Sequence, residues 1–149
     1  MNANLKHAPH GGLDEYDRHY RAGEFLPFYV PRSAMPQVDE KDQPRMVAAA
    51  MGAGIGIAFE VRHVGDVRAH QRVNKHIASS MSEMVKRKPV IVSSDGYILD
   101  GNHRWWANVH DGNDWLVAIT VDRTFDEARD WLLSQPYVYE INPYTAIRN

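Results

Sequence analysis

The fold is decided by residues 89–107, which read Pro89-Val90-Ile91-Val92-Ser93-Ser94-Asp95-Gly96-Tyr97-Ile98-Leu99-Asp100-Gly101-Asn102-His103-Arg104-Trp105-Trp106-Ala107. Two short apolar runs, at 90–92 and 97–99, flank Ser-Ser-Asp-Gly, a composition typical of a tight turn whose glycine takes positive φ. We therefore predict a β-hairpin. The second strand runs into Asp-Gly-Asn, which ends a strand and supplies an N-cap, so a helix is predicted from His103 to about His110.

The first turn of this helix is suited to an anion. A helix N-terminus directs backbone N–H groups outward at the positive end of the helix dipole. Arg104 adds a planar guanidinium that donates two parallel hydrogen bonds. The residues thus predict an anion site at the strand-to-helix junction, with phosphate as the best-fitting ligand.

The order of these motifs resembles the ParB N-terminal/sulfiredoxin superfamily, which binds nucleotide phosphate at this junction. The pattern is a strand, Asp-Gly-x-His-Arg, then Trp-x-Ala, and the resemblance extends from Val61 to Val121. It implies an α+β fold of mixed α/β character: a compact ParB/sulfiredoxin-like domain with a small mixed sheet flanked by helices. It also implies ATP, ADP or CTP as the ligand.

Family residues carry over only where they match. Gly101 and Arg104 match the glycine and an arginine of the family's phosphate loop, and His103 matches the sulfiredoxin histidine. Asn102 stands where sulfiredoxin has its catalytic cysteine and ParB a glutamate. Sulfinic-acid reduction is therefore excluded, and the ParB clamp mechanism is not carried over. We predict that residues 101–104 bind nucleotide phosphate.

Further polar residues complete the predicted site. His70, Gln71 and Asn74 lie near the start of the next expected helix, where they would flank the phosphate loop; helix capping is the alternative. Asp100 is placed to hold Mg²⁺ or orient a water, and is predicted to be catalytic together with His103. The alternative for Asp100 is a turn or N-cap residue, and for Arg104 an ion pair with a core carboxylate.

Composition restricts the function classes. The chain has 149 residues, 44% of them hydrophobic, which suits one domain. Its net charge of −2 gives no overall attraction to nucleic acid, although the run Lys86-Arg87-Lys88 could meet phosphates. The absence of cysteine excludes disulfides, thiolate metal sites and cysteine nucleophiles. No apolar run or leader indicates a membrane span or signal peptide, so we expect a cytoplasmic protein, in the host cytoplasm if it is phage-encoded.

Three regions are expected along the chain: an N-terminal extension or arm over residues 1–35, the domain over 36–135, and a tail over 136–149 that packs on the domain or on a second copy. In the extension, Leu13, Tyr16 and Tyr20 share one face of a short helix predicted between Gly12 and Gly23.

The remaining elements follow from periodicity. A helix over 39–51 carries the apolar stripe Met46, Val47, Ala50 and Met51, and the glycines of 52–56 end it rather than cradle phosphate, because a phosphate loop lies between a strand and a helix. A half-buried strand is predicted over 57–67, with an apolar face of Phe59, Val61 and a packed His63. A helix over 73–86 has a buried stripe of Val73, Ile77, Met81, Met84 and Val85. A strand over 115–121 reads as buried on both faces, and a capping box at Thr124 and Glu127 opens the last helix.

Three function classes stay open. The first is a nucleotide-dependent enzyme that hydrolyses or transfers a phosphate. The second is a nuclease acting on DNA, because solitary modules of this kind resemble the ParB-like nucleases of bacteriophages. The third is a non-catalytic phage factor that binds and blocks a host protein. A homodimer is a further option, since many relatives form one.

Overall fold

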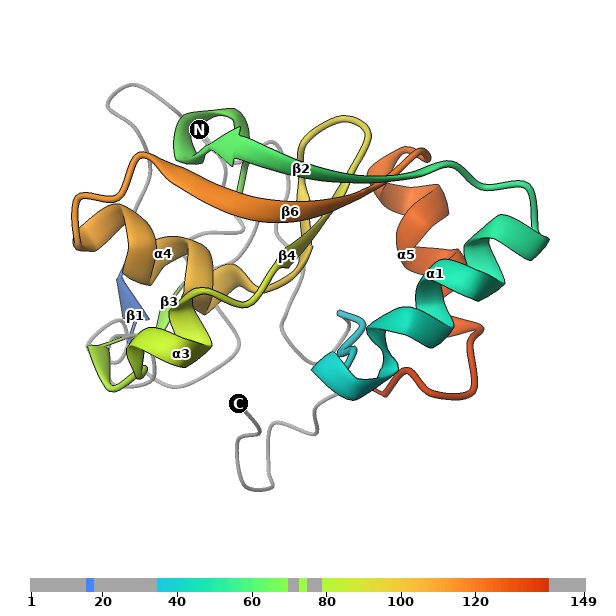
Figure 1. Ribbon diagram of the computed structural model, residues 1–149, viewed down its shortest axis with the longest axis horizontal. Coiled ribbons are helices and arrows are strands. Elements are labelled where there is room, and N and C mark those ends of the chain that lie inside the picture. Colours follow the sequence, from blue (N-terminus) through green and yellow to red (C-terminus); the bar gives the residue numbers. More distant parts are fainter. Residues whose placement is uncertain (1–15, 18–34, 70–72, 75–78, 140–149) are drawn as a thin grey trace.

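The computed structural model describes residues 16–17, 35–69, 73–74 and 79–139 (Figure 1). Their order is β1 (Tyr16–Asp17), 3-10 helix η4 (Glu40–Asp42), α1 (Gln43–Gly52), β2 (Ile57–His63), 3-10 helix η5 (Val64–Asp66), β3 (Val73–Asn74), α3 (Glu83–Lys86), β4 (Val90–Ser93), β5 (Ile98–Asp100), α4 (Asn102–His110), β6 (Trp115–Val121) and α5 (Phe125–Leu133). The fold is α+β, as predicted.

The main sheet is mixed and has the strand order β2-β6-β4-β5. β2 and β6 pair antiparallel along their whole length, β6 and β4 pair parallel, and β4 and β5 form the predicted antiparallel hairpin. Gly96 in the hairpin turn has φ +87°, the left-handed backbone expected of this glycine. A second, two-stranded sheet pairs β1 with β3.

Two hydrophobic clusters cover the two faces of the main sheet. Side chains alternate along β4, so Ile91 enters one cluster while Val90 and Val92 enter the other. The first cluster joins the sheet to α1 and α5, and the second joins it to α4. The helices also differ in their position along the strands: Figure 1 shows α4 near one end and α1 with α5 near the other.

Several local predictions are confirmed. The glycines after α1 end the helix, since Gly54 has φ +73° and Ile55 N donates to Ala50 O at 2.8 Å. The capping box of Thr124 and Glu127 opens α5. α4 starts one residue earlier than predicted. Within the described ranges, no helix has the length and apolar character that crossing a membrane would require.

Two predicted helices are wrong. Residues 16–17 form β1, where Tyr16 pairs with Asn74, because pairing with a distant strand satisfies backbone groups that a short isolated helix would leave open. Leu13 and Tyr20 lie outside the described residues. Among the described residues of the helix expected over 73–86, Val73–Asn74 form the strand β3 and Glu83–Lys86 form the short helix α3. Ser82 causes the late start of α3, because its hydroxyl accepts from Val85 N at 3.2 Å as an N-cap.

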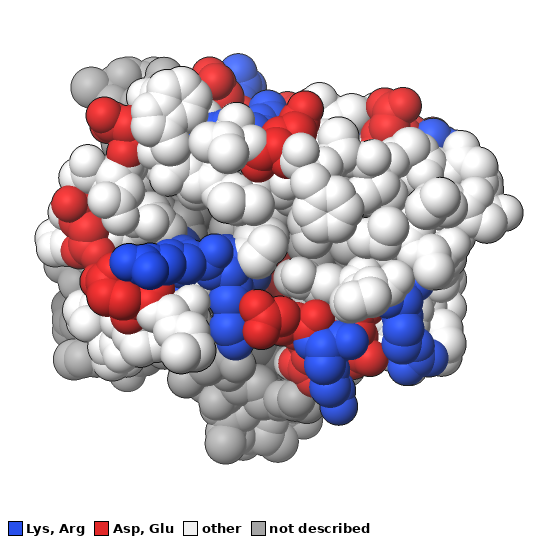
Figure 2. Space-filling model, viewed as in Figure 1, with Lys and Arg blue, Asp and Glu red and all other residues white. Residues whose placement is uncertain are grey.

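The predicted burial of four strand residues is also wrong. Phe59 and Val61 of β2 are 64% and 67% exposed, and their neighbours on β6, Val117 and Trp115, are 41% and 61% exposed. α1 and α5 cover this face only near Ile119 and Val121, so the other half stays open. In Figure 2 a broad uncharged area lies where Figure 1 places β2, β6 and α1.

The expected lengths and stripes need smaller corrections. β2 ends at His63 rather than at residue 67, because residues 64–66 turn into η5. Met51 and Met84, both assigned to buried stripes, are 71% and 77% exposed. His63 is packed as predicted: its ring meets Trp115 edge-on, and its Nδ1 accepts from Gly65 N at 3.0 Å.

The start of the C-terminal tail lies on the domain. Gln37 and Tyr139 form an isolated antiparallel bridge, and the Tyr139 hydroxyl donates to Asp39 Oδ1 at 2.8 Å. Tyr137 packs against the first cluster, where burial raises the pKa of its hydroxyl. Residues 140–149 lie outside the described part of the chain.

Candidate functional site

The junction between β5 and α4 is built on a glycine. Gly101 is the N-cap of α4 and has φ +109°, a backbone conformation that L side chains rarely adopt. A Cβ on Gly101 would lie 2.7 Å from Val90 Cγ1 and 3.0 Å from Arg104 Nη2. The chain therefore turns from strand to helix directly against β4, with the Arg104 side chain folded over the turn.

The first turn of α4 has backbone N–H groups that precede the first intrahelical hydrogen bond. The ladder begins with Trp105 N, which donates to Gly101 O at 2.9 Å. No side chain caps the helix, which has nine residues. The amides of residues 102–104 thus precede the intrahelical bonds, which is the arrangement that binds anions at helix N-termini.

Arg104 is held from one side only. Its Nη2 donates to Pro89 O at 3.1 Å, at the start of β4, and its buried Nε has no hydrogen-bond partner. Among the described residues it forms no ion pair, so the structural alternative of a core carboxylate is not found there. The guanidinium keeps donors for a further acceptor.

Asn102 is the least expected feature of the junction. Its side chain is 7% exposed, and neither its Nδ2 nor its Oδ1 has a hydrogen-bond partner. Burying an amide in this way costs about 1–3 kcal/mol for each unsatisfied group, so native proteins rarely retain it without a reason. A donor and an acceptor are therefore held unused at the N-terminus of α4.

Asp100 has a structural contact. Its Oδ2 accepts from Val38 N at 2.9 Å and so fixes the segment that leads into η4. It is not the N-cap of α4. In the described ranges no three metal-ligating side chains come together, and Asp100 is the only carboxylate of residues 100–104. Mg²⁺ at Asp100 therefore stays a prediction.

The other predicted residues are placed as follows. His103 is buried, at 6% exposed, on the first turn of α4. Asn74 belongs to β3, which lies against α4, so the fold brings this strand to the helix. His70 and Gln71 lie outside the described residues. Trp105 and Trp106 are core residues, and Trp105 Nε1 donates to Val64 O at 3.0 Å.

α4 is also tied at its far end. Asn108 is as buried as Asn102 but fully used: its Nδ2 donates to Lys86 O and Arg104 O, and its Oδ1 accepts from Asn113. Lys86 pairs with Asp111 and Glu83, and the hydrogen bond to Asp111 is the main reason that its pKa is raised. The helix is thus firmly positioned, while the Asn102 amide and Nε of Arg104, both in its first turn, have no hydrogen-bond partner.

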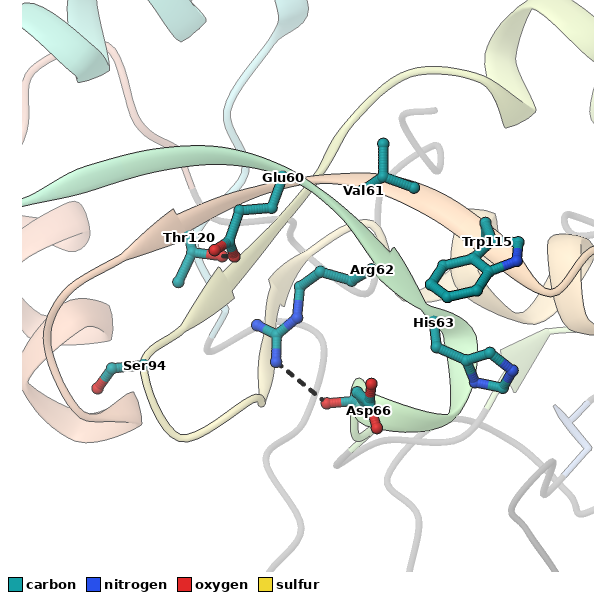
Figure 3. Close-up of a pocket in the computed structure, with 8 residues that line it drawn as sticks. All are labelled: Glu60, Val61, Arg62, His63, Asp66, Ser94, Trp115 and Thr120. Atoms are coloured by element: carbon teal, nitrogen blue, oxygen red, sulfur yellow. Dashed lines mark hydrogen bonds between the residues drawn. The ribbon is translucent and has the colours of Figure 1, made fainter.

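A polar hollow that sequence reasoning missed lies beside β2 (Figure 3). It has a volume of about 400 Å³, and Arg62 points into it and donates to Asp66 O at 3.4 Å. Glu60 accepts from Thr120 Oγ1 at 2.7 Å on the same side. The signal in the sequence was the alternation of charged and apolar residues along β2. The charged side chains that line the hollow, Glu60, Arg62 and Asp66, carry both signs, so they indicate no particular ligand.

Comparison of the chain with protein-family models, with curated proteins and with solved structures found no match.

We predict that Gly101→Ala destabilises the protein more than a matched glycine substitution. Left-handed backbone at a non-glycine residue costs about 1–2 kcal/mol. Gly112 has φ +80° with nothing within 4 Å of the place where a Cβ would lie, so Gly112→Ala meets that cost alone, whereas Gly101→Ala also meets Val90. In thermal melts the loss of Tm for Gly101→Ala should be about twice that for Gly112→Ala. Equal losses would show that Val90 moves aside easily.

We predict that Asp100→Ala lowers stability by about 1.5–3 kcal/mol, because it leaves Val38 N without its charged acceptor. Asp100→Asn keeps a side-chain oxygen and should lose less than half as much. Chemical denaturation of both variants measures this. If both unfold like the wild type, the contact with Val38 does not stabilise the fold.

Proposed function

We propose that the protein binds the phosphate of a nucleotide, ATP, ADP or CTP, at the β5–α4 junction and hydrolyses or transfers that phosphate. The observation that carries the proposal is the buried, unpaired side chain of Asn102 at the N-terminus of α4. A helix N-terminus alone is common, but one that also retains a buried unsatisfied amide has polar groups that a bound phosphate or ribose would satisfy.

The geometry supports a phosphate rather than a cation. The first-turn amides and the positive end of the helix dipole favour negative charge. Arg104 adds a delocalised cation whose Nε has no acceptor. Asn102 supplies one further donor, together with an acceptor for a hydroxyl or a base amino group.

The resemblance to the ParB/sulfiredoxin superfamily supplies the nucleotide part of the proposal. Asp-Gly-Asn-His-Arg stands at the strand-to-helix junction, where that family holds nucleotide phosphate. His103 follows Asn102 on the same turn and is the proposed general acid or base. A Mg²⁺ carried by the nucleotide would be held mainly by phosphate oxygens, with Asp100 as the nearby carboxylate.

The nuclease alternative has less support. The basic run of residues 86–88 is the local patch that was expected to meet DNA phosphates. However, Lys86 forms ion pairs with Asp111 and Glu83, and Lys88 Nζ lies 3.7 Å from Glu40 Oε1. Figure 2 shows Lys and Arg side chains next to Asp and Glu along this face, without a continuous basic surface. Strong DNA binding needs such a surface.

We predict that Arg104→Ala weakens nucleotide binding tens- to hundreds-fold and leaves the fold intact. The substitution removes a charge-assisted contact of about 2–4 kcal/mol in a partly desolvated site. Arg104→Lys should restore little, because an ammonium cannot reproduce the planar fork. Calorimetry with ATP, ADP and CTP measures the effect, with thermal melts as the folding control. A wild-type protein that binds none of the three refutes the nucleotide proposal.

We predict that Asn102→Leu stabilises the free protein and abolishes nucleotide binding. Leu has nearly the shape of Asn and removes two unsatisfied buried groups, which should raise stability by about 1–3 kcal/mol. Asn108→Leu is the matched control: Asn108 is equally buried but fully hydrogen-bonded, so its replacement should destabilise the protein. If Asn102→Leu destabilises the protein as much as Asn108→Leu does, Asn102 is a structural residue.

A further inference from the structure

β2 is an edge strand with one open side. In the described chain it pairs only with β6. At its two ends, Val64 N donates to Asp114 O and Asp122 N donates to Gly56 O, so even-numbered residues face β6. The register between these points has no shift. Residues 57, 59, 61 and 63 therefore direct their backbone N–H and C=O groups away from the sheet.

The edge has few of the features that usually prevent pairing. Edge strands are commonly blunted by lysine, proline or a bulge, and β2, with the sequence Ile-Ala-Phe-Glu-Val-Arg-His, has none of these. Phe59 and Val61 are exposed on one face, beside Val117 and Trp115. Figure 3 shows Val61 on one side of the strand and Glu60 and Arg62 on the other. Exposed apolar groups next to an open backbone edge mark an interaction surface.

We propose that this edge pairs with the β2 of a second copy of the chain, antiparallel about a two-fold axis at Val61. The two sheets would join into one continuous sheet of eight strands, with a self-complementary interface. Val61 then lies opposite the partner's Val61, and both are residues whose backbone groups point outward. Phe59 lies opposite the partner's His63 in the same way, which gives a regular ladder of hydrogen bonds.

The charges on β2 select this register. With the axis at Val61, Glu60 lies opposite the partner's Arg62 on each side of the axis, and opposite charges across strands stabilise pairing. An axis one residue earlier or later sets Glu60 against Glu60 or Arg62 against Arg62, which repel. Pairing with a second copy requires charges that are complementary about one central residue. Pairing with an unrelated peptide would not require this symmetry.

The same arrangement covers part of the open apolar face. β2 begins just after α1, so an antiparallel partner brings its α1 end to the His63 and Trp115 end of the first copy. The exposed Met51 stands at the end of α1, in an apolar hollow that it forms with Val47 and Phe59. The α1 end of each copy thus places apolar surface beside the half of the partner's sheet face that the partner's own α1 and α5 do not cover.

The test is the association state of the full chain in solution. Sedimentation velocity at about 0.1 mM should show a dimer, a concentration that detects even weak pairing. Val61→Glu places two like charges on the axis and should give a monomer that still unfolds cooperatively, at a Tm lowered by no more than the lost association accounts for. Met84→Glu adds the same charge at a position on α3 that is at least as exposed as Val61, and it should stay dimeric. A monomeric wild type, or a dimer that survives Val61→Glu, overturns the proposal.

A charge exchange tests the register. Glu60→Arg and Arg62→Glu should each raise the dissociation constant by about tenfold or more, because each homodimer then opposes like charges twice. Mixing the two variants should restore dimers, since every opposing pair in the mixed dimer has opposite charges. Failure of the mixture to associate, when each variant alone is folded and monomeric, overturns the register.

An engineered cysteine gives a direct reading, because the chain has none of its own. Residues directly opposite in an antiparallel pair lie about 5.5 Å apart at Cα, within the range that a disulfide spans. Val61→Cys should cross-link to itself under mild oxidation. Val117→Cys lies one strand further in, at β6, and should not. Cross-linking of Val117→Cys in place of Val61→Cys would place the contact elsewhere and refute the proposal.

Discussion

The close contact between Gly101 and Val90 sets the position of everything around the candidate site. Val90 opens the central strand β4, whose side chains enter both hydrophobic clusters, and Gly101 lies so near that no side chain fits between them. The turn from β5 into α4 is therefore forced against the sheet. This brings the first turn of α4 to Pro89, whose carbonyl oxygen accepts a hydrogen bond from Arg104 Nη2.

The site adds polar groups that the fold does not satisfy. The side-chain amide of Asn102 and Nε of Arg104 are buried and have no hydrogen-bond partner. Asn108, on the same helix, shows that a buried side-chain amide can be fully hydrogen-bonded there. One unsatisfied group costs about 1–3 kcal/mol out of a total stability of about 5–15 kcal/mol. Retaining several at one helix end makes sense when a ligand supplies the missing hydrogen bonds.

The sequence predicted the features that depend on neighbouring residues. The hairpin, the start of α4, the glycines after α1 and the capping box of α5 are all set within a few positions. The errors concern features set from a distance. The stripe over 73–86 has helical spacing, yet β1 pairs with Val73–Asn74 and Ser82 caps a separate helix. β6 is apolar at nearly every position, but which half of it is covered depends on where α1 and α5 end. For the site, the residue types pointed to the junction, whereas the missing partners of Asn102 could be seen only in three dimensions.

The two proposed surfaces lie at opposite edges of one sheet. The strand order β2-β6-β4-β5 sets the candidate ligand site beyond β5 and the pairing edge at β2, with two strands between them. In a dimer joined through β2, both β5–α4 junctions would lie at the outer ends of the continuous sheet, where the partner does not cover them. The residues at the dimer axis and those at the loop are different. A change at Val61 should therefore leave the loop unaltered, and a change at Arg104 should leave the edge unaltered, so each surface can be tested in a protein where the other is intact.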